Sequence, residues 1–66
     1  MEIIFNGKPS ELRTGTSIQE LLDRLRLDCL QVVVEHNHNI ITRQRLAETT
    51  LNNGDTLEVI HFVGGG

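Results

Sequence analysis

The sequence predicts a small α+β domain in which one amphipathic helix covers one face of a mixed sheet of four to five strands. Three observations support this class. The chain has only 66 residues, which favours a single domain over residues 1–66. One segment has helical hydrophobic periodicity, and several short β-branched runs are separated by Asn-Gly turns. Because the helix must bury its apolar side against a sheet face, two layers result.

The first element is a β-hairpin. Residues 2–6, EIIFN, are rich in β-branched and aromatic side chains and lead into Asn6-Gly7. Asn-Gly is a preferred pair for a two-residue turn because both positions accept positive φ. The chain should then return as a strand through residues 8–14. Pro9 cannot donate a ladder hydrogen bond, so we expect it near the beginning of that strand or on a free edge.

The second element is the helix. Ser17 and Glu20 have the spacing of a capping box, in which each side chain bonds a free amide of the first turn. We expect the helix to run from about Ile18 to Leu25 or Arg26. Four apolar residues with helical spacing form its buried side: Ile18, Leu21, Leu22 and Leu25.

The remaining chain predicts three more strands. LQVVVE, at 30–35, is suited to a central strand, IIT to a short one and TLEVIHFV, at 56–63, to the last one. RQRLAETTL, at 43–51, is either irregular or a single helical turn, and Asn53-Gly54-Asp55 indicates a turn. This order permits the β-grasp arrangement, in which the first and last strands pair in parallel at the sheet centre.

Size and charge argue against several functions. So short a chain buries only about 60% of its unfolded surface, and an enclosed small-molecule site usually needs roughly 300 Å³ or more. A self-sufficient enzyme is therefore not expected. The net charge is −3, the bases are scattered and only two aromatics are present, which argues against nucleic acid and favours a basic protein partner.

The sequence also indicates a compartment. No apolar run approaches the roughly 20 residues of a membrane span, and the acidic start, Met1-Glu2, is unlike a signal peptide. Cys29 is the single cysteine, whereas small domains of oxidising compartments usually carry several disulfides. We therefore expect a cytoplasmic protein that does not contact membranes.

The end of the sequence is the main candidate site. Gly64, Gly65 and Gly66 lack side chains, so an extended backbone of glycines can enter a channel too narrow for other residues. We expect residues 63–66 to form a flexible tail that presents the carboxylate of Gly66 to another protein's active site. ATP can activate a carboxylate as an acyl-adenylate, which sulfur or nitrogen then attacks. The alternative is a frayed terminus or a cloning remnant.

The last strand offers a docking surface next to this tail. Leu57 and Val59 share one side of the strand, and Ile60 and Phe62 share the other. If the first pair fills the core, the second pair forms an outer apolar patch that leads to the tail. The alternative is that Phe62 folds over its own sheet edge.

The histidines and the cysteine have simpler interpretations than catalysis. His36 and His38 lack the spacing of a zinc site, and a solvated turn explains them better than a metal. Cys29 has no base positioned nearby in the sequence and is expected to be a partly buried structural thiol. We therefore expect no metal site and no catalytic residue in this chain.

The sequence resembles the ThiS family of thiamine-biosynthesis sulfur carrier proteins over essentially its whole length. The matching segments are IIFNGK, TSIQELL, VVVEHNHNIITRQR and NNGDTLEVIHFVGGG, of which the last is the most diagnostic. Ubiquitin and the small subunit of molybdopterin synthase resemble it in having a last strand followed by terminal glycines, but their chains are typically longer. One departure is Leu46, where many members carry Trp or Tyr.

The resemblance implies a ubiquitin-like β-grasp fold and a reaction cycle. An E1-like enzyme would adenylate the Gly66 carboxylate with ATP and magnesium, so that no cofactor is stably bound to the carrier itself. A cysteine desulfurase or another persulfide donor would then supply sulfur to form a thiocarboxylate. Thiazole synthase would take up that sulfur. Gly64 and Gly65 would thread into the partner site, and Ile60, Phe62 and Val63 would dock.

Three other functions remain open from the sequence. A molybdopterin synthase small subunit uses the same tail chemistry within a permanent enzyme complex. A ubiquitin-like modifier ends in an amide bond to a target lysine. A plain interaction domain would carry its glycines incidentally.

Overall fold

Five strands form one mixed sheet in the computed structural model, which describes residues 1–62. The strand order across the sheet is β2-β1-β5-β3-β4. The strands, in chain order, are β1 (Glu2–Phe5), β2 (Lys8–Glu11), β3 (Val32–His36), β4 (Asn39–Ile41) and β5 (Thr56–His61). The prediction of a mixed sheet with four to five strands is confirmed.

The first and last strands pair in parallel at the centre of the sheet. Ile4 lies opposite Thr56 and Phe5 opposite Leu57, and β5 pairs with β3 in the antiparallel sense on its other side. The whole intervening chain, including the helix, separates these two parallel neighbours. This is the β-grasp topology that the sequence permits and the resemblance implies.

The hairpin turn forms as predicted, but its second strand is shorter. Asn6 and Gly7 have φ values of 48° and 82°, the positive values that the turn requires. Strand β2 ends at Glu11, whereas residues 8–14 were expected to be extended. Backbone hydrogen bonds continue for one more residue, because Leu12 and Met1 bond each other at 2.8 and 2.9 Å, but β1 places no residue opposite 13–14. Pro9 lies in this edge strand, as expected.

The helix α1 (Ile18–Arg24) begins at the predicted cap. Ser17 Oγ accepts from the Glu20 amide at 3.1 Å, and Glu20 Oε1 accepts from the Ser17 amide at 3.1 Å. The helix ends slightly before the predicted end, because Arg26 adopts a φ of 58° that a right-handed helix excludes. Leu25 was expected on the buried side, which is wrong: it is 45% exposed.

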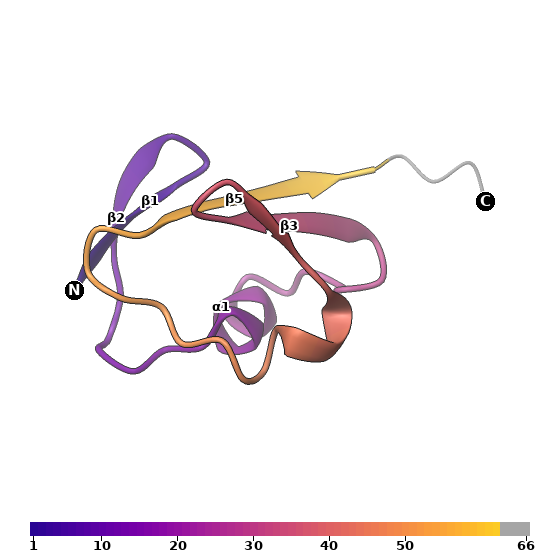
Figure 1. Cartoon of the computed structure of the whole chain (residues 1–66), viewed down its shortest axis with the longest axis horizontal. Helices are drawn as coiled ribbons and strands as arrows, with labels where there is room; N and C mark the ends of the chain where they lie inside the picture. The colour runs from indigo at the N-terminus through magenta and orange to yellow at the C-terminus, as the bar shows by residue number, and fades with distance from the viewer. Residues whose placement is uncertain (63–66) are drawn as a thin grey trace.

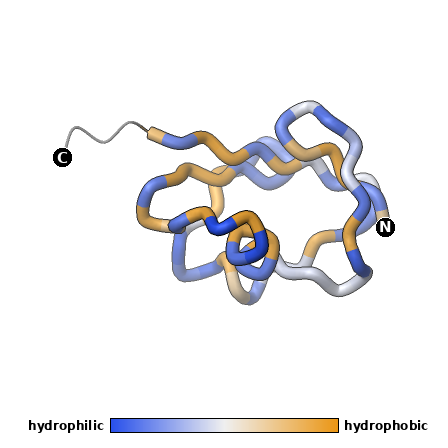
Figure 2. Tube along the Cα trace, turned by 180° about the vertical axis from the view of Figure 1, so that it is seen from behind, coloured by the Kyte–Doolittle hydropathy of each residue, from blue (hydrophilic) through white to orange (hydrophobic). Residues whose placement is uncertain are grey.

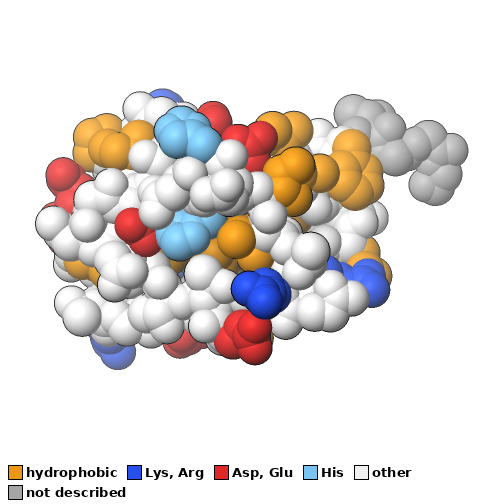
Figure 3. Space-filling view, in the orientation of Figure 1, with side chains coloured by type: hydrophobic (Ala, Val, Ile, Leu, Met, Phe, Trp, Pro, Cys, Tyr) orange, Lys and Arg blue, Asp and Glu red, His pale blue; other side chains and the backbone are white. Residues whose placement is uncertain are grey.

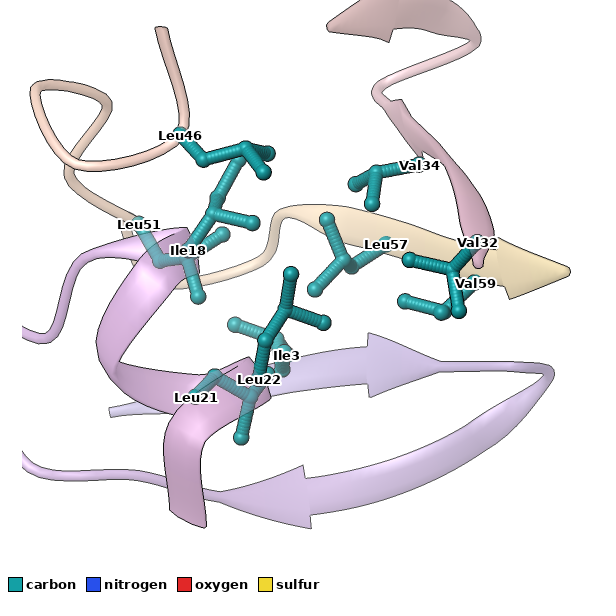
Figure 4. Packing of buried hydrophobic residues seen from close by; sticks show 10 residues of the cluster. All are labelled: Ile3, Ile18, Leu21, Leu22, Val32, Val34, Leu46, Leu51, Leu57 and Val59. Atoms are coloured by element: carbon teal, nitrogen blue, oxygen red, sulfur yellow. The ribbon is translucent and has the colours of Figure 1, made fainter. Parts of the chain in front are cut away.

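Strands β3, β5 and β1 together with α1 enclose one hydrophobic core (Figure 4). The segment after β4 contributes Leu46 and Leu51, which are 2% and 1% exposed. It begins with the short 3₁₀ helix η1 (Arg43–Arg45), which agrees with the prediction of an irregular stretch or single turn. Leu46 therefore lies in the core and not on the surface proposed for docking.

The segment after η1 also completes the beginning of α1. The Ile18 amide donates to the Thr49 carbonyl and the Gln19 amide donates to the Leu46 carbonyl, both at 3.0 Å. The first amides of a helix have no partner within the helix. Together with the Ser17 cap, these two bonds satisfy the first three helical amides.

The sheet and the helix form two layers. Figure 1 shows α1 beneath the sheet, and nothing in the described part of the chain covers the opposite face above β5 and β3. Figure 2 shows that hydrophobic residues predominate along the trace of β5 and are interrupted by single hydrophilic ones, so both faces of this strand carry apolar side chains. Across residues 1–62, no helix has the length and apolarity needed to cross a membrane.

Candidate docking face and carboxyl-terminal tail

The two faces of β5 are divided as predicted. Leu57 is fully buried and Val59 is 9% exposed, and both point toward α1. On the other side, Ile60 is 52% exposed and Phe62, just after the strand, is 48% exposed. About half of the Phe62 side chain is therefore accessible to a partner, and this exposed fraction alone does not test the alternative that it folds over the sheet edge. The docking role of Ile60 and Phe62 stays a prediction.

This uncovered side of the whole sheet, which we call the open face, is apolar next to Phe62 where β5 and β3 pair. Ile60 lies directly opposite Val33, and Glu58 lies directly opposite Glu35. Side chains at such paired positions share one face of the sheet. Figure 3 shows acidic and hydrophobic side chains side by side in this upper region of the molecule. The open face therefore combines apolar surface with carboxylates.

The position of the strand end is set by β3 and the loop that precedes it. His61 pairs with Val32, and the Phe62 amide donates to the Gln31 carbonyl at 3.3 Å. Leu30, next to Gln31 in the chain, is 58% exposed. Leu30 could not be recognised from the sequence as part of this surface. It lies near Phe62 only because β3 pairs with β5, and these two strands are far apart in the sequence.

The predicted tail lies outside the described residues. It comprises Val63, Gly64, Gly65 and Gly66. The predictions that Val63 docks, that Gly64 and Gly65 thread into a partner and that Gly66 is modified are therefore not tested by the structure.

Asn6 attaches the tail-bearing strand to the hairpin. Its side-chain Oδ1 accepts from the Val59 amide at 2.8 Å, and its Nδ2 donates to the Val59 carbonyl at 3.4 Å. The primary amide thus continues the β1–β5 ladder after β1 has turned away, because it offers the same donor and acceptor as a peptide group. The turn signal at Asn6-Gly7 gave no indication of this second role.

A polar cluster fixes the other end of β5. His36 Nε2 lies 2.7 Å from Asp55 Oδ2, and their side chains are only 16% and 12% exposed. Asp55 also accepts from the Asn52 amide at 2.8 Å and from Asn37 Nδ2 at 3.2 Å. Burial raises the pKa of Asp55, but the hydrogen bonds from His36, Asn52 and Asn37 and the charge of His36 outweigh it, so the pKa lies below its ordinary value.

The prediction of a solvated turn for both histidines is thus only half right. His38 is exposed in the β3–β4 turn, but His36 is the last residue of β3 and pairs with Asp55. Within residues 1–62, no three His, Cys, Asp or Glu side chains gather closely enough to hold a metal ion. Cys29 is partly buried and packs against the core, as expected for a structural thiol.

Comparison with known proteins identifies the family. Residues 3–66 match the model of the ThiS family. The sulfur carrier protein ThiS of Bacillus subtilis is 42% identical over 62 residues, which cover 92% of this chain and 94% of that protein. The crystal structure of a thiamine biosynthesis protein (ThiS) from Geobacter metallireducens superimposes with a TM-score of 0.86 at 35% identity, covering 100% of both chains.

A second kind of relative is longer. The thiazole synthase of Paramagnetospirillum magneticum is 33% identical over 66 residues, which are 100% of this chain and 20% of that protein. The chain thus spans about a fifth of the length of the thiazole synthases that it matches. The family model and the two full-length matches agree with the β-grasp topology described above. The chain belongs to the ThiS family.

Proposed function

We propose that this chain is a sulfur carrier protein that supplies the sulfur of the thiazole in thiamine biosynthesis. The observation that carries the proposal is the match of residues 3–66, glycines included, to the ThiS family. The near-complete coverage of the Bacillus subtilis and Geobacter metallireducens proteins supports it. In this proposal the chain is the substrate, and the catalytic groups belong to the partner enzymes.

The proposed chemistry takes place at the carboxylate of Gly66. A carboxylate is a poor electrophile, so an E1-like partner first uses ATP and magnesium to form an acyl-adenylate and release pyrophosphate. A persulfide sulfur, supplied by a cysteine desulfurase or a comparable donor, then displaces AMP. Cleavage of the remaining sulfur–sulfur bond by a thiol leaves the thiocarboxylate. Gly64 and Gly65 add no side chains near the reacting carbon, which lets a narrow partner channel hold the backbone.

Thiazole synthase is the proposed acceptor of the sulfur. Its support is that segments similar to this chain form about a fifth of two thiazole synthases. We propose that Ile60, Phe62 and Val63 contact the partners, because the first two are half exposed on the sheet face that α1 leaves open. The cytoplasm is the proposed compartment, since Cys29 offers no internal disulfide and the reaction needs ATP and reduced sulfur.

A mass measurement tests the carrier role. The purified protein is incubated with the E1-like enzyme, magnesium ATP and a persulfide donor, and its intact mass is followed. We expect the mass to increase by the difference between one sulfur and one oxygen, and a variant that lacks Gly66 to remain unchanged. An unchanged wild-type mass under conditions where the enzyme hydrolyses ATP would contradict the proposal.

A second measurement separates the thiazole pathway from the alternatives. The thiocarboxylate form is given to thiazole synthase and, separately, to a molybdopterin synthase large subunit. We expect the mass to return to that of the carboxylate only with thiazole synthase. Sulfur transfer only to the large subunit, or an amide bond between Gly66 and a lysine, would assign the chain to one of the other two functions.

A further inference from the structure

On the open face of the sheet, every charged residue that a strand contributes is acidic. Ile3, Val34, Leu57 and Val59 point toward the core, so their strand neighbours point away from it. The outward residues include all four glutamates of the strands, namely Glu2, Glu11, Glu35 and Glu58. They form two directly opposed pairs, Glu2 with Glu11 and Glu35 with Glu58.

Basic side chains are placed elsewhere. The chain has six lysines and arginines, of which five lie outside the strands. The sixth, Lys8, lies opposite Phe5, and Phe5 packs against the core, so this pair is on the helix side of the sheet. No strand of the described chain therefore contributes a lysine or arginine to the open face, whose charged residues on the strands are all acidic.

The pair formed by Glu35 and Glu58 lies within the apolar part of this face. Both side chains are partly buried, and neither has an ion-pair partner among residues 1–62. Val33 and Ile60 form the next outward pair along the same two strands, and Ile40 of β4, which is 68% exposed, lies opposite Glu35. Directly opposed side chains have Cβ atoms about 4.5–5.5 Å apart, where like charges repel.

The other acidic pair is different. Glu11 is 79% exposed and lies 3.9 Å from the amino group of Met1, so a positive charge within the chain already partly compensates it. It is also in the edge strand β2, away from Ile60 and Phe62. Glu35 and Glu58 are thus the carboxylates next to the predicted docking patch that lack a positive partner.

We propose that the open face binds a protein surface that places a lysine or arginine between Glu35 and Glu58 and apolar side chains against Val33, Ile60 and Phe62. The inference rests on the proposed function and specifies the chemistry of the docking partner. A partner without this positive charge would bury two like charges unpaired, which is strongly unfavourable. A second copy of this chain packed face to face would bring more carboxylates together, so it fits less well.

The test uses the double variant Glu35→Gln/Glu58→Gln and the full chain. Its matched control is Asp23→Asn/Glu48→Gln, which removes the same net charge at two exposed sites outside the sheet. Binding of each protein to the E1-like enzyme is measured by calorimetry at low and at high salt. We expect roughly tenfold weaker binding of the double variant at low salt and a flatter salt dependence, with the control close to wild type.

A second readout uses the free protein. Removing the repulsion should raise the melting temperature of Glu35→Gln/Glu58→Gln by roughly 1–5 °C, which also shows that the variant folds. Equal affinity and equal salt dependence of wild type and double variant, with normal sulfur loading of the wild type, would overturn this inference alone. Wild-type protein that neither binds the enzyme nor gains sulfur would refute the proposed function and this inference with it. Wild-type protein that sediments as a dimer, in competition with the enzyme, would make a second copy the occupant and would also overturn it.

Discussion

Replacing Asp55 by asparagine should destabilise the connection between the β3–β4 turn and the residues that lead into β5. The carboxylate accepts three hydrogen bonds, from His36 Nε2, the Asn52 amide and Asn37 Nδ2, at 2.7–3.2 Å. An asparagine has one acceptor oxygen, so its NH₂ group must face at least one of these donors. Hydrogen bonds contribute about 0.5–1.5 kcal/mol each, and more to a charged group, so we expect a loss of about 1–3 kcal/mol at neutral pH.

That loss is large for this protein. At about 0.05–0.15 kcal/mol per residue, the free energy of unfolding of a domain this size is roughly 3–10 kcal/mol. A loss of about 1–3 kcal/mol corresponds to a melting temperature lower by roughly 5–20 °C. Urea unfolding followed by far-ultraviolet circular dichroism measures the free energy directly. The control is Asp23→Asn, because Asp23 is an exposed helical carboxylate that accepts one side-chain bond, from Gln19; it should change stability by less than about 0.5 kcal/mol.

The pH dependence gives the sign of the effect. The pKa of Asp55 in the folded protein lies below its ordinary value of 3.8, so the folded state holds the proton less tightly than the unfolded state. The carboxylate therefore contributes its full stabilisation above the ordinary value and loses it as the pH falls through the lowered pKa. The difference between wild type and Asp55→Asn should shrink in acid. Equal stability at neutral pH, or a difference that persists unchanged below the lowered pKa, would refute this reasoning.

Three further perturbations separate the tail, the open face and the attachment of β5. Deleting Gly66 should abolish sulfur loading but change the free energy of unfolding by less than about 0.5 kcal/mol, because the buried core found among residues 1–62 runs from Ile3 to Val59. Marked destabilisation would assign the tail a structural role. Phe62→Asp should weaken binding to the E1-like enzyme by roughly tenfold or more and change the melting temperature little. Unfolding of this variant would show that Phe62 packs in the core. Asn6→Gly keeps a residue that accepts positive φ but removes both hydrogen bonds to Val59. We expect the free energy of unfolding, measured with urea, to fall by about 1–2 kcal/mol. Wild-type stability of this variant would argue against the attachment.

The segment between β4 and β5 explains why a leucine occupies position 46. Leu46 is 2% exposed in the core, and its carbonyl accepts the Gln19 amide. The residue thus fills space beneath the sheet and completes the helix start. The side chain at position 46 is therefore a matter of core packing in this chain and does not alter the open face.

Local signals determined the turns and the start of the helix. Asn6-Gly7 and the pair Ser17 and Glu20 could be predicted because each depends on contacts within four residues. The carboxyl-terminal ends of β2 and α1 were harder to predict from the sequence. Strand β2 stops where its partner begins, and the helix ends near Arg26, whose positive φ is unusual for a residue other than glycine.

The amino-acid sequence by itself determined the turns, the start of the capped helix and the two faces of β5, since these depend on residue chemistry and periodicity within short segments. Only the tertiary structure decided that Asn6 bonds Val59, that His36 meets Asp55 and that Glu35 faces Glu58. These partners are 53, 19 and 23 residues apart in the sequence. Strand register brings them together, and register depends on how the whole core packs.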